Sequence, residues 1–405
     1  MKSTACIAVI VSVALLQACA AVEYYAQAIG GHLDLIARAV PIEERLREPD
    51  LAAPLRVKLQ RVAAIRDFAS RELALPDNGS YRRYAELDRA FVVWNVFAAP
   101  EYSVKPVESC FPVAGCVSYR GFYREADAQA HAASLRARGY DVHIGGVPAY
   151  STLGWFDDPV LSTFIRYPDA EVARLIFHEL AHQVAYVKND TVFNESFAVA
   201  VEQEGVQRWL VRNGTMQERA AHETLQLRRR EFVALVTSHR DRLAAFYAQA
   251  IEAEKKREGK ARLLAGMIED YGRLKAGWGG FSGFDRIFAQ GANNALLASV
   301  TAYTERVPAF RALLAGKGGD LPAFYAEVRE LARLDKPARD ARLAGLADPG
   351  NWGVMLRTVA ASRASCRRGA RPGAGTRHRG FSSPGARPAS HTSRRRSSRA
   401  ECHRW

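Results

Sequence analysis

Hydrophobic positions along the chain recur mainly at the three- and four-residue spacing of helices. Residues 23–75 carry two such stretches, which are interrupted around Pro49 and Asp50 and end in the turn sequence PDNGS. Because side chains three or four residues apart share one helix face, this pattern predicts an N-terminal helical region. The same spacing predicts a largely helical chain from Gly205 to about residue 275, and two or three more helices up to about residue 345.

A shorter part of the chain has the composition of strands. Residues 90–97, with the sequence AFVVWNVF, and the stretch around Cys110 and Cys116 are rich in aromatic and β-branched side chains. Residues 124–139 favour a short helix, and a further strand is predicted at 140–147. These elements predict a small sheet with one covering helix, so the expected fold class is α+β and predominantly α-helical.

The net charge of +14 is concentrated at one end of the chain. Residues 361–405 contain twelve arginines and a single acid, Glu401, so they account for +11 of that charge. This tail is rich in Arg, Ser, Gly and Pro and has no hydrophobic period, which predicts disorder. A basic arm for nucleic acid, a solvated extension and a frameshifted reading of an arginine-rich gene are the three alternatives. The rest of the chain is nearly neutral, and because the first residues predict export from the cytosol, no nucleic-acid partner is expected for the tail.

The first residues have the features of an export signal. Lys2 precedes a short apolar run over 5–16, which is too short for a permanent membrane span. The run ends in Leu-Gln-Ala-Cys, which resembles a bacterial lipobox and predicts cleavage after residue 18 and lipidation of Cys19. We therefore expect a protein anchored in the bacterial envelope and facing the periplasm, most simply at the outer membrane. A plain secretory signal is the alternative, and it also exports the chain.

Export changes the oxidation state that is expected of the remaining cysteines. Cys110 and Cys116 flank a five-residue segment that contains Pro112 and Gly115. In an oxidising compartment such a pair closes as a disulfide. Two free thiols or a pair of metal ligands are the alternatives, although the spacing suits zinc poorly.

The motif His178-Glu179-Leu180-Ala181-His182 is the strongest chemical signal in the chain. Two histidines four residues apart lie on one helix face and can bind one metal ion, with Glu179 beside the open position as general base and acid. Asp169 is the expected cap of this helix. The alternative is an ordinary surface helix with two histidines.

A third ligand distinguishes the two interpretations. Glu195, in the sequence NESFA, follows His182 by thirteen residues and begins a helical run. Glu202 and Glu204 are rival acidic ligands, but Glu202 is two turns further along the same face and too far to share the ion easily. We therefore expect His178, His182 and Glu195 to bind one zinc ion.

These motifs resemble a known family. HELAHQ, NESFA, the lipobox, CFPVAGCVSYRGFY and QGANNALLASVTAYTERVPAF together resemble the "putative aminopeptidase" family of exported bacterial zinc metallopeptidases, over roughly residues 15–345. The resemblance implies a thermolysin-like, or gluzincin-like, catalytic core and a peptide substrate. It also implies that Glu179 activates a zinc-held water for attack on the scissile carbonyl. The loop between His182 and Glu195 is shorter than is usual in gluzincins. In addition, Val199 replaces the aspartate that orients a zinc histidine in thermolysin-like enzymes.

Other roles are less well marked in the sequence. Tyr303 and Tyr150 are candidates for a hydroxyl that stabilises the oxyanion, and Asp157 or Asp158 for binding a substrate amine. A non-catalytic envelope lipoprotein that keeps the fold for binding is the rival function. The expected organisation is a lipoprotein signal (1–18), an N-terminal helical region (19–89), a catalytic core (90–210), a C-terminal helical lobe (211–350) and the tail (361–405).

Overall fold

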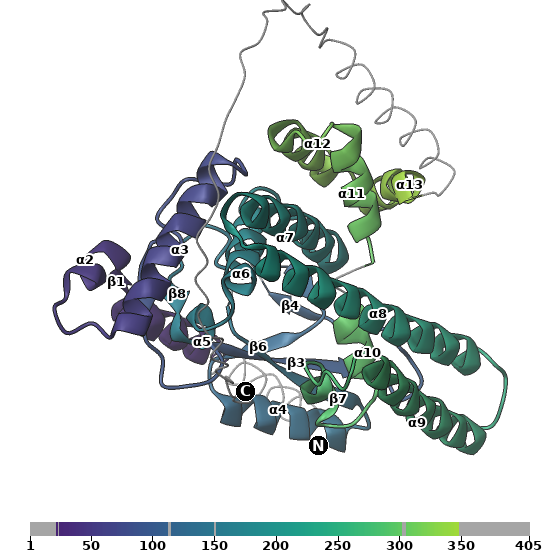
Figure 1. Cartoon of the computed structure of the whole chain (residues 1–405). Coiled ribbons are helices and arrows are strands. Elements are labelled where there is room, and N and C mark those ends of the chain that lie inside the picture. The colour runs from purple at the N-terminus through teal and green to yellow at the C-terminus, as the bar shows by residue number, and fades with distance from the viewer. Residues whose placement is uncertain (1–21, 23, 112–114, 150, 302–304, 348–405) are drawn as a thin grey trace, which may run out of the picture. The chain divides into compact units, whose positions relative to one another are not determined.

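The structure is a computed structural model whose elements are labelled in Figure 1; the described residues are 22, 24–111, 115–149, 151–301 and 305–347. The predicted signal, the lipidation site Cys19, Tyr150, Tyr303 and the arginine-rich tail lie outside these residues. What the sequence indicates for them stays a prediction. Within the described part of the chain, no helix has both the length and the apolar character needed to cross a membrane.

The N-terminal region is mainly helical, as the hydrophobic spacing predicts. A helix over 24–38 is followed by α2 (Ile42–Arg47) and α3 (Ala53–Arg71). One face of α3 is buried in the main core at helical spacing, through Leu59, Val62, Ile65, Phe68 and Ala69. This region also contributes two strands to a small mixed sheet that the sequence did not predict. Its order is β1-β2-β8, with strands β1 (Val40–Pro41), β2 (Arg83–Ala85) and β8 (Val160–Leu161).

A buried arginine fixes the loop that follows α3. Arg66 is fully buried, and its guanidinium donates hydrogen bonds to the carbonyl oxygens of Ser80, Pro76 and Asn78. Asn78 Nδ2 in turn donates to Gln183 Oε1 at 2.7 Å, directly after the second histidine of the motif. Burial lowers the pKa of Arg66 to about 10. Because this value is still well above 7, the side chain remains charged at neutral pH.

The predicted sheet and its covering helix lie in the middle of the chain. β3 (Val93–Ala99) is the central strand and pairs antiparallel with β6 (Arg120–Phe122) and β7 (Asp141–Val147). The side chains of β3 alternate between two faces. Trp94, Val96 and Ala98 pack against α4 (Glu125–Ala137), whereas Phe97 and Ala99 pack against Ala295 on the other face. Figure 1 shows α4 and α10 on opposite sides of these strands.

The two motif helices form the centre of the main core. After the short α5 (Ser162–Ile165), α6 (Asp169–His182) packs against α7 (Thr191–Asn213). The helix cap differs from the prediction, because Pro168 occupies the cap position and Asp169 is the first helical residue. The Asp169 carboxylate instead pairs with Lys58 and Arg61 of α3, at 2.7 Å and 2.8 Å.

The C-terminal part of the described chain is helical. α8 (Met216–Tyr247) begins with a capping box of Thr215 and Glu218 and packs side by side with α9 (Ala253–Gly277), as Figure 1 shows. The remaining elements are η1 (Asp285–Phe288), α10 (Asn294–Thr301), α11 (Val307–Gly316), α12 (Leu321–Arg333) and α13 (Lys336–Ala347). α10 packs against β3, β7 and α8, and α11 packs against α7, so α11 borders the second motif helix.

The cysteine pair lies in a two-stranded ribbon. β4 (Ser109–Phe111) and β5 (Gly115–Val117) pair antiparallel, with Cys110 opposite Cys116, and the two cysteines form a disulfide. Gly115 has a φ of 76°, in the left-handed region that favours glycine.

The α+β, predominantly helical fold class predicted from the sequence is confirmed. The predicted strand at 90–97 is displaced, since β3 begins at Val93 and ends at Ala99. The β1-β2-β8 sheet escaped prediction because its strands are two or three residues long, too short for a period to be detected. The domain boundaries given above stay predictions.

Replacing Arg66 with methionine should destabilise the fold markedly. The variant leaves three carbonyl oxygens, that of Ser80 buried and those of Pro76 and Asn78 partly buried, without their charged donor, which we expect to cost about 3 kcal/mol. Urea unfolding followed by circular dichroism measures the change. The matched control is Arg71→Met, because Arg71 lies on the same helix with its side chain 77% exposed. A loss of less than about 1 kcal/mol for Arg66→Met would contradict the assigned role.

Candidate metal centre

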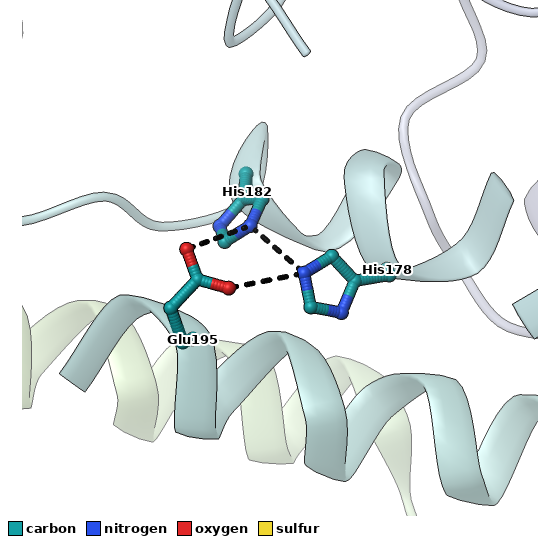
Figure 2. Close-up of side chains that lie close together, drawn as sticks. All are labelled: His178, His182 and Glu195. Carbon is teal, nitrogen blue, oxygen red and sulfur yellow. Dashed lines mark hydrogen bonds and ion pairs between the residues drawn. The ribbon is translucent and has the colours of Figure 1, made fainter. Parts of the chain in front are cut away.

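Two helices bring the three predicted metal ligands together. His178 and His182 lie one turn apart on α6, and Glu195 projects from α7 towards both imidazole rings (Figure 2). His178 Nε2 lies 3.2 Å from Glu195 Oε2 and 3.3 Å from His182 Nε2. His182 Nε2 lies 3.9 Å from Glu195 Oε1. One ligand atom from each residue falls within 4.8 Å of the others, so the donors converge on one point.

The short loop between the helices is closed by Asn194. Its Oδ1 accepts a hydrogen bond from the Val187 backbone N–H at 2.8 Å, and its Nδ2 donates to the Val187 carbonyl oxygen at 2.8 Å. The side chain therefore joins Val187, in the middle of the loop, to the residue that precedes Glu195 on α7. This closure explains how thirteen residues after His182 suffice to return a carboxylate to the histidines.

Two further interactions hold this loop from outside. Asn189 has a φ of 65°, which asparagine tolerates better than most residues, and its Oδ1 accepts a hydrogen bond from Cys116 N at 2.7 Å. Asp190 caps α7 by accepting from Phe193 N, and it forms a buried ion pair with Arg339 of α13 at 2.6 Å. The disulfide ribbon and the last described helix thus both position the start of α7.

Glu202 orients the first histidine. Its Oε2 lies 2.9 Å from His178 Nδ1, which leaves His178 Nε2 facing Glu195 and His182. The sequence presented Glu202 and Glu204 as rival metal ligands, and neither belongs to the converging group. Glu204 instead pairs with Arg208 at 2.7 Å. Glu202 thus supplies the acceptor for the histidine N–H that the sequence left unidentified, two turns beyond Glu195 on the same helix face.

A chain of alternating charges extends from Glu202 away from the centre. Arg174 lies 3.1 Å from Glu202 and 2.8 Å from Glu171, and Arg229 of α8 lies 3.2 Å from the same Glu171 oxygen. Burial raises the pKa of Glu171, but Arg174 and Arg229 outweigh it and hold that pKa at about 2. The chain keeps Glu202 ionised as well, because Arg174 and His178 lower its pKa against the effect of burial.

The charges at the centre suit a cation. Burial, followed by repulsion from Glu195, raises the pKa of Glu179 to about 7, although the His178 charge opposes this. Burial disfavours the charged form of His178, but Glu195 and Glu202 raise its pKa to about 10. Burial lowers the pKa of His182 to about 4. A positive ion would reduce the repulsion between buried carboxylates that lie close together around two imidazoles. The residues therefore fit a divalent metal that accepts nitrogen and oxygen ligands.

The centre opens into a cavity of about 1040 Å³. Residues from the N-terminal helix, the β3 and β6 strands and helices α6, α7, α8 and α11 line it, and Glu179 lies among them. A cavity of this size takes a ligand as large as a short peptide. The geometry therefore combines a candidate metal site with a potential general base at the wall of a substrate-sized space.

Among the remaining predicted residues, Tyr150 and Tyr303 lie outside the described part of the chain. Asp157 and Asp158 do not line the cavity, and Asp158 is 1% exposed and accepts hydrogen bonds from Thr152. They are therefore not placed to bind a substrate amine.

Two tyrosines that the sequence did not single out do line the cavity. They are Tyr119 and Tyr186. Tyr186 lies in the loop four residues after His182, and its ring centroid is 6.4 Å from the His182 ring; its closeness to the motif in the sequence is the one signal that could have pointed to it. Tyr119 follows the disulfide ribbon, far from the motif in the sequence, so no local pattern points to it.

The role of Glu202 predicts a loss of metal affinity when its charge is removed. In Glu202→Gln, His178 loses its ionised acceptor, so zinc should bind about 10- to 100-fold more weakly. Competition with a chromogenic chelator measures the affinity. Glu204→Gln is the matched control on the same helix and should bind zinc as the wild type does. An unchanged affinity in Glu202→Gln would contradict the assignment.

Comparison with known proteins gives a family for this chain. The family model described as "Putative aminopeptidase" matches residues 23–343, a span that includes both motif helices and most of the described residues. No match was found among curated proteins or among solved structures. Because the match covers well over half of the chain, the protein belongs to this putative aminopeptidase family.

Proposed function

We propose that this chain is a zinc-dependent peptidase that binds one zinc ion through His178, His182 and Glu195. The convergence of these three donors is the observation on which the proposal rests. The family to which the chain belongs supports a peptide substrate, and the cavity beside the donors has room for one. Zinc is favoured because two imidazoles and a carboxylate are a usual ligand set of catalytic zinc sites.

A zinc ion bound there would polarise the scissile carbonyl and make a water molecule acidic enough to attack it. Glu179 provides the proton transfer that this attack needs. Glu179 lines the cavity and directly follows His178, so it lies beside the ligand group at the wall of the space that a substrate would occupy. Burial raises its pKa to about 7, which suits a group that takes a proton from water and gives it to the leaving amine.

A hydroxyl donor for the developing oxyanion is also available in the cavity. Tyr119 and Tyr186 both line it, and the charge of Glu195 affects the pKa of each. Burial raises both pKa values above the ordinary range, so each hydroxyl keeps its proton at neutral pH. A protonated phenol can donate a hydrogen bond to the oxyanion, and we assign this role to one of these two residues.

The proposal predicts separate effects on catalysis and on metal binding. Replacing Glu179 with glutamine removes the proton acceptor but none of the three zinc ligands, so kcat should fall about 10²- to 10⁴-fold while zinc remains bound. Hydrolysis of amino-acid anilides and of short peptides, together with the zinc content, measures both quantities. Glu204→Gln is the control and should retain activity.

The rival function makes the opposite prediction. A non-catalytic binding protein with the same fold would hydrolyse no peptide as wild type, even when loaded with zinc. It would also show no difference between wild type and Glu179→Gln. That result would overturn the proposed peptidase activity and would leave the metal site as a structural one.

A further inference from the structure

The described residues that line the cavity carry more arginines than its carboxylates can pair with. Four arginines line it, namely Arg174, Arg229, Arg230 and Arg311. The carboxylates are Glu179, Glu195 and Glu202. Glu195 faces the two histidines, and Glu202 pairs with His178 and Arg174. Only Glu179 remains, and its proposed task is proton transfer.

Two of the arginines are exposed and have no ion partner in the described part of the chain. Arg230 comes from α8 and Arg311 from α11, so they approach the cavity from separate elements. Surface arginines elsewhere in the fold commonly pair with a carboxylate, as Arg257 does with Glu101 and Glu254. Neither Arg230 nor Arg311 forms such a pair with a described residue, so the described carboxylates leave both to a ligand.

Two further donors beside Arg230 also lack an acceptor among the residues that the structure describes. Gln226 Nε2 and Arg229 Nη1 are buried atoms without a hydrogen-bond partner among the described residues, and both side chains line the cavity. Gln226, Arg229 and Arg230 lie within about one turn of α8. Donors that are buried without an acceptor are costly, and an anionic acceptor would satisfy them.

We propose that Gln226, Arg229 and Arg230 of α8, with Arg311 of α11, form a subsite for a carboxylate of the substrate. This inference rests on the proposed peptidase function, because in a peptide the anionic group is a carboxylate. It is either the C-terminal carboxylate of a short peptide or an acidic side chain. An arginine fork binds a carboxylate through two parallel hydrogen bonds, which gives orientation as well as affinity.

The location of the subsite follows from the charge chain. Arg229 pairs with Glu171, which pairs with Arg174, which pairs with Glu202 behind His178. The α8 donors are therefore connected to the metal centre on its Glu202 side. A peptide with its scissile bond at the centre and a carboxylate held by α8 would be oriented by charge at one end. A short free peptide meets this requirement with its own C-terminus.

The test compares peptides that differ only in a carboxylate. The probes are a free tripeptide, its C-terminal amide, and two amidated tripeptides that carry either glutamate or glutamine as the last residue. Calorimetric binding to zinc-loaded Glu179→Gln protein and hydrolysis by the wild type are both measured. We expect the free acid to bind about fivefold to tenfold more tightly than the amide, and kcat/KM to differ by a similar factor.

The double variant Arg230→Gln/Arg311→Gln should lose most of this discrimination and still bind zinc. Arg262→Gln is the matched control, because Arg262 of α9 is exposed, does not line the cavity and has no ion partner among the described residues. It should discriminate as the wild type does. If only the glutamate and glutamine peptides differ, the carboxylate that is recognised is a side chain.

The remaining outcomes distinguish this inference from the proposed function. Hydrolysis of all probes at similar kcat/KM would overturn the subsite and leave the peptidase function intact. Carboxylate-dependent binding without any hydrolysis by the wild type would support the subsite and contradict the peptidase function. Discrimination that survives unchanged in the double variant would overturn the assignment to these arginines, and a panel that neither binds nor reacts would contradict both proposals.

Discussion

The metal centre depends on a single short loop, because only that loop returns Glu195 to the two histidines of α6. Asn194 closes the loop by bonding both backbone groups of Val187, and Asn189 fastens it to the disulfide ribbon. Asp190 caps the helix that follows and is buried against Arg339. A buried ion pair adds little net stability but strongly penalises any arrangement in which it is broken. The start of α7 is therefore held in one place by contacts with distant parts of the chain.

The same helices that provide the ligands also set their electrostatics. Glu202 contacts Nδ1 of His178, the ring nitrogen that does not face the other ligands, and Arg174 keeps Glu202 ionised inside the fold. Without such a counter-charge, burial would favour a protonated carboxyl group that could not orient the imidazole. The line of charges continues through Glu171 to α8, where side chains with donors that no described residue accepts line the cavity. Metal binding and the proposed carboxylate recognition thus share one continuous polar layer.

The sequence could predict the parts of this site that depend on local periodicity. His178 and His182 share a helix face by spacing alone, and the position of Glu195 at the start of another helix follows from its hydrophobic pattern. The hydrogen-bond partner of His178 was harder to predict from the sequence. Glu202 was considered only as a metal ligand, and the pattern of thermolysin-like enzymes places the orienting carboxylate at position 199. Tyr119, Arg230 and Arg311 reach the cavity only through tertiary packing, which a single sequence does not reveal.

The most direct test of the account is the zinc content and zinc affinity of purified protein in which Glu195 is replaced with glutamine. The wild type should hold about one zinc ion per chain. Because Glu195 faces both histidines, its replacement should weaken binding by more than the about 10- to 100-fold expected for an outer partner such as Glu202. Glu204→Gln should match the wild type. Zinc held by Glu195→Gln with wild-type affinity would contradict the assignment of Glu195 as the third ligand.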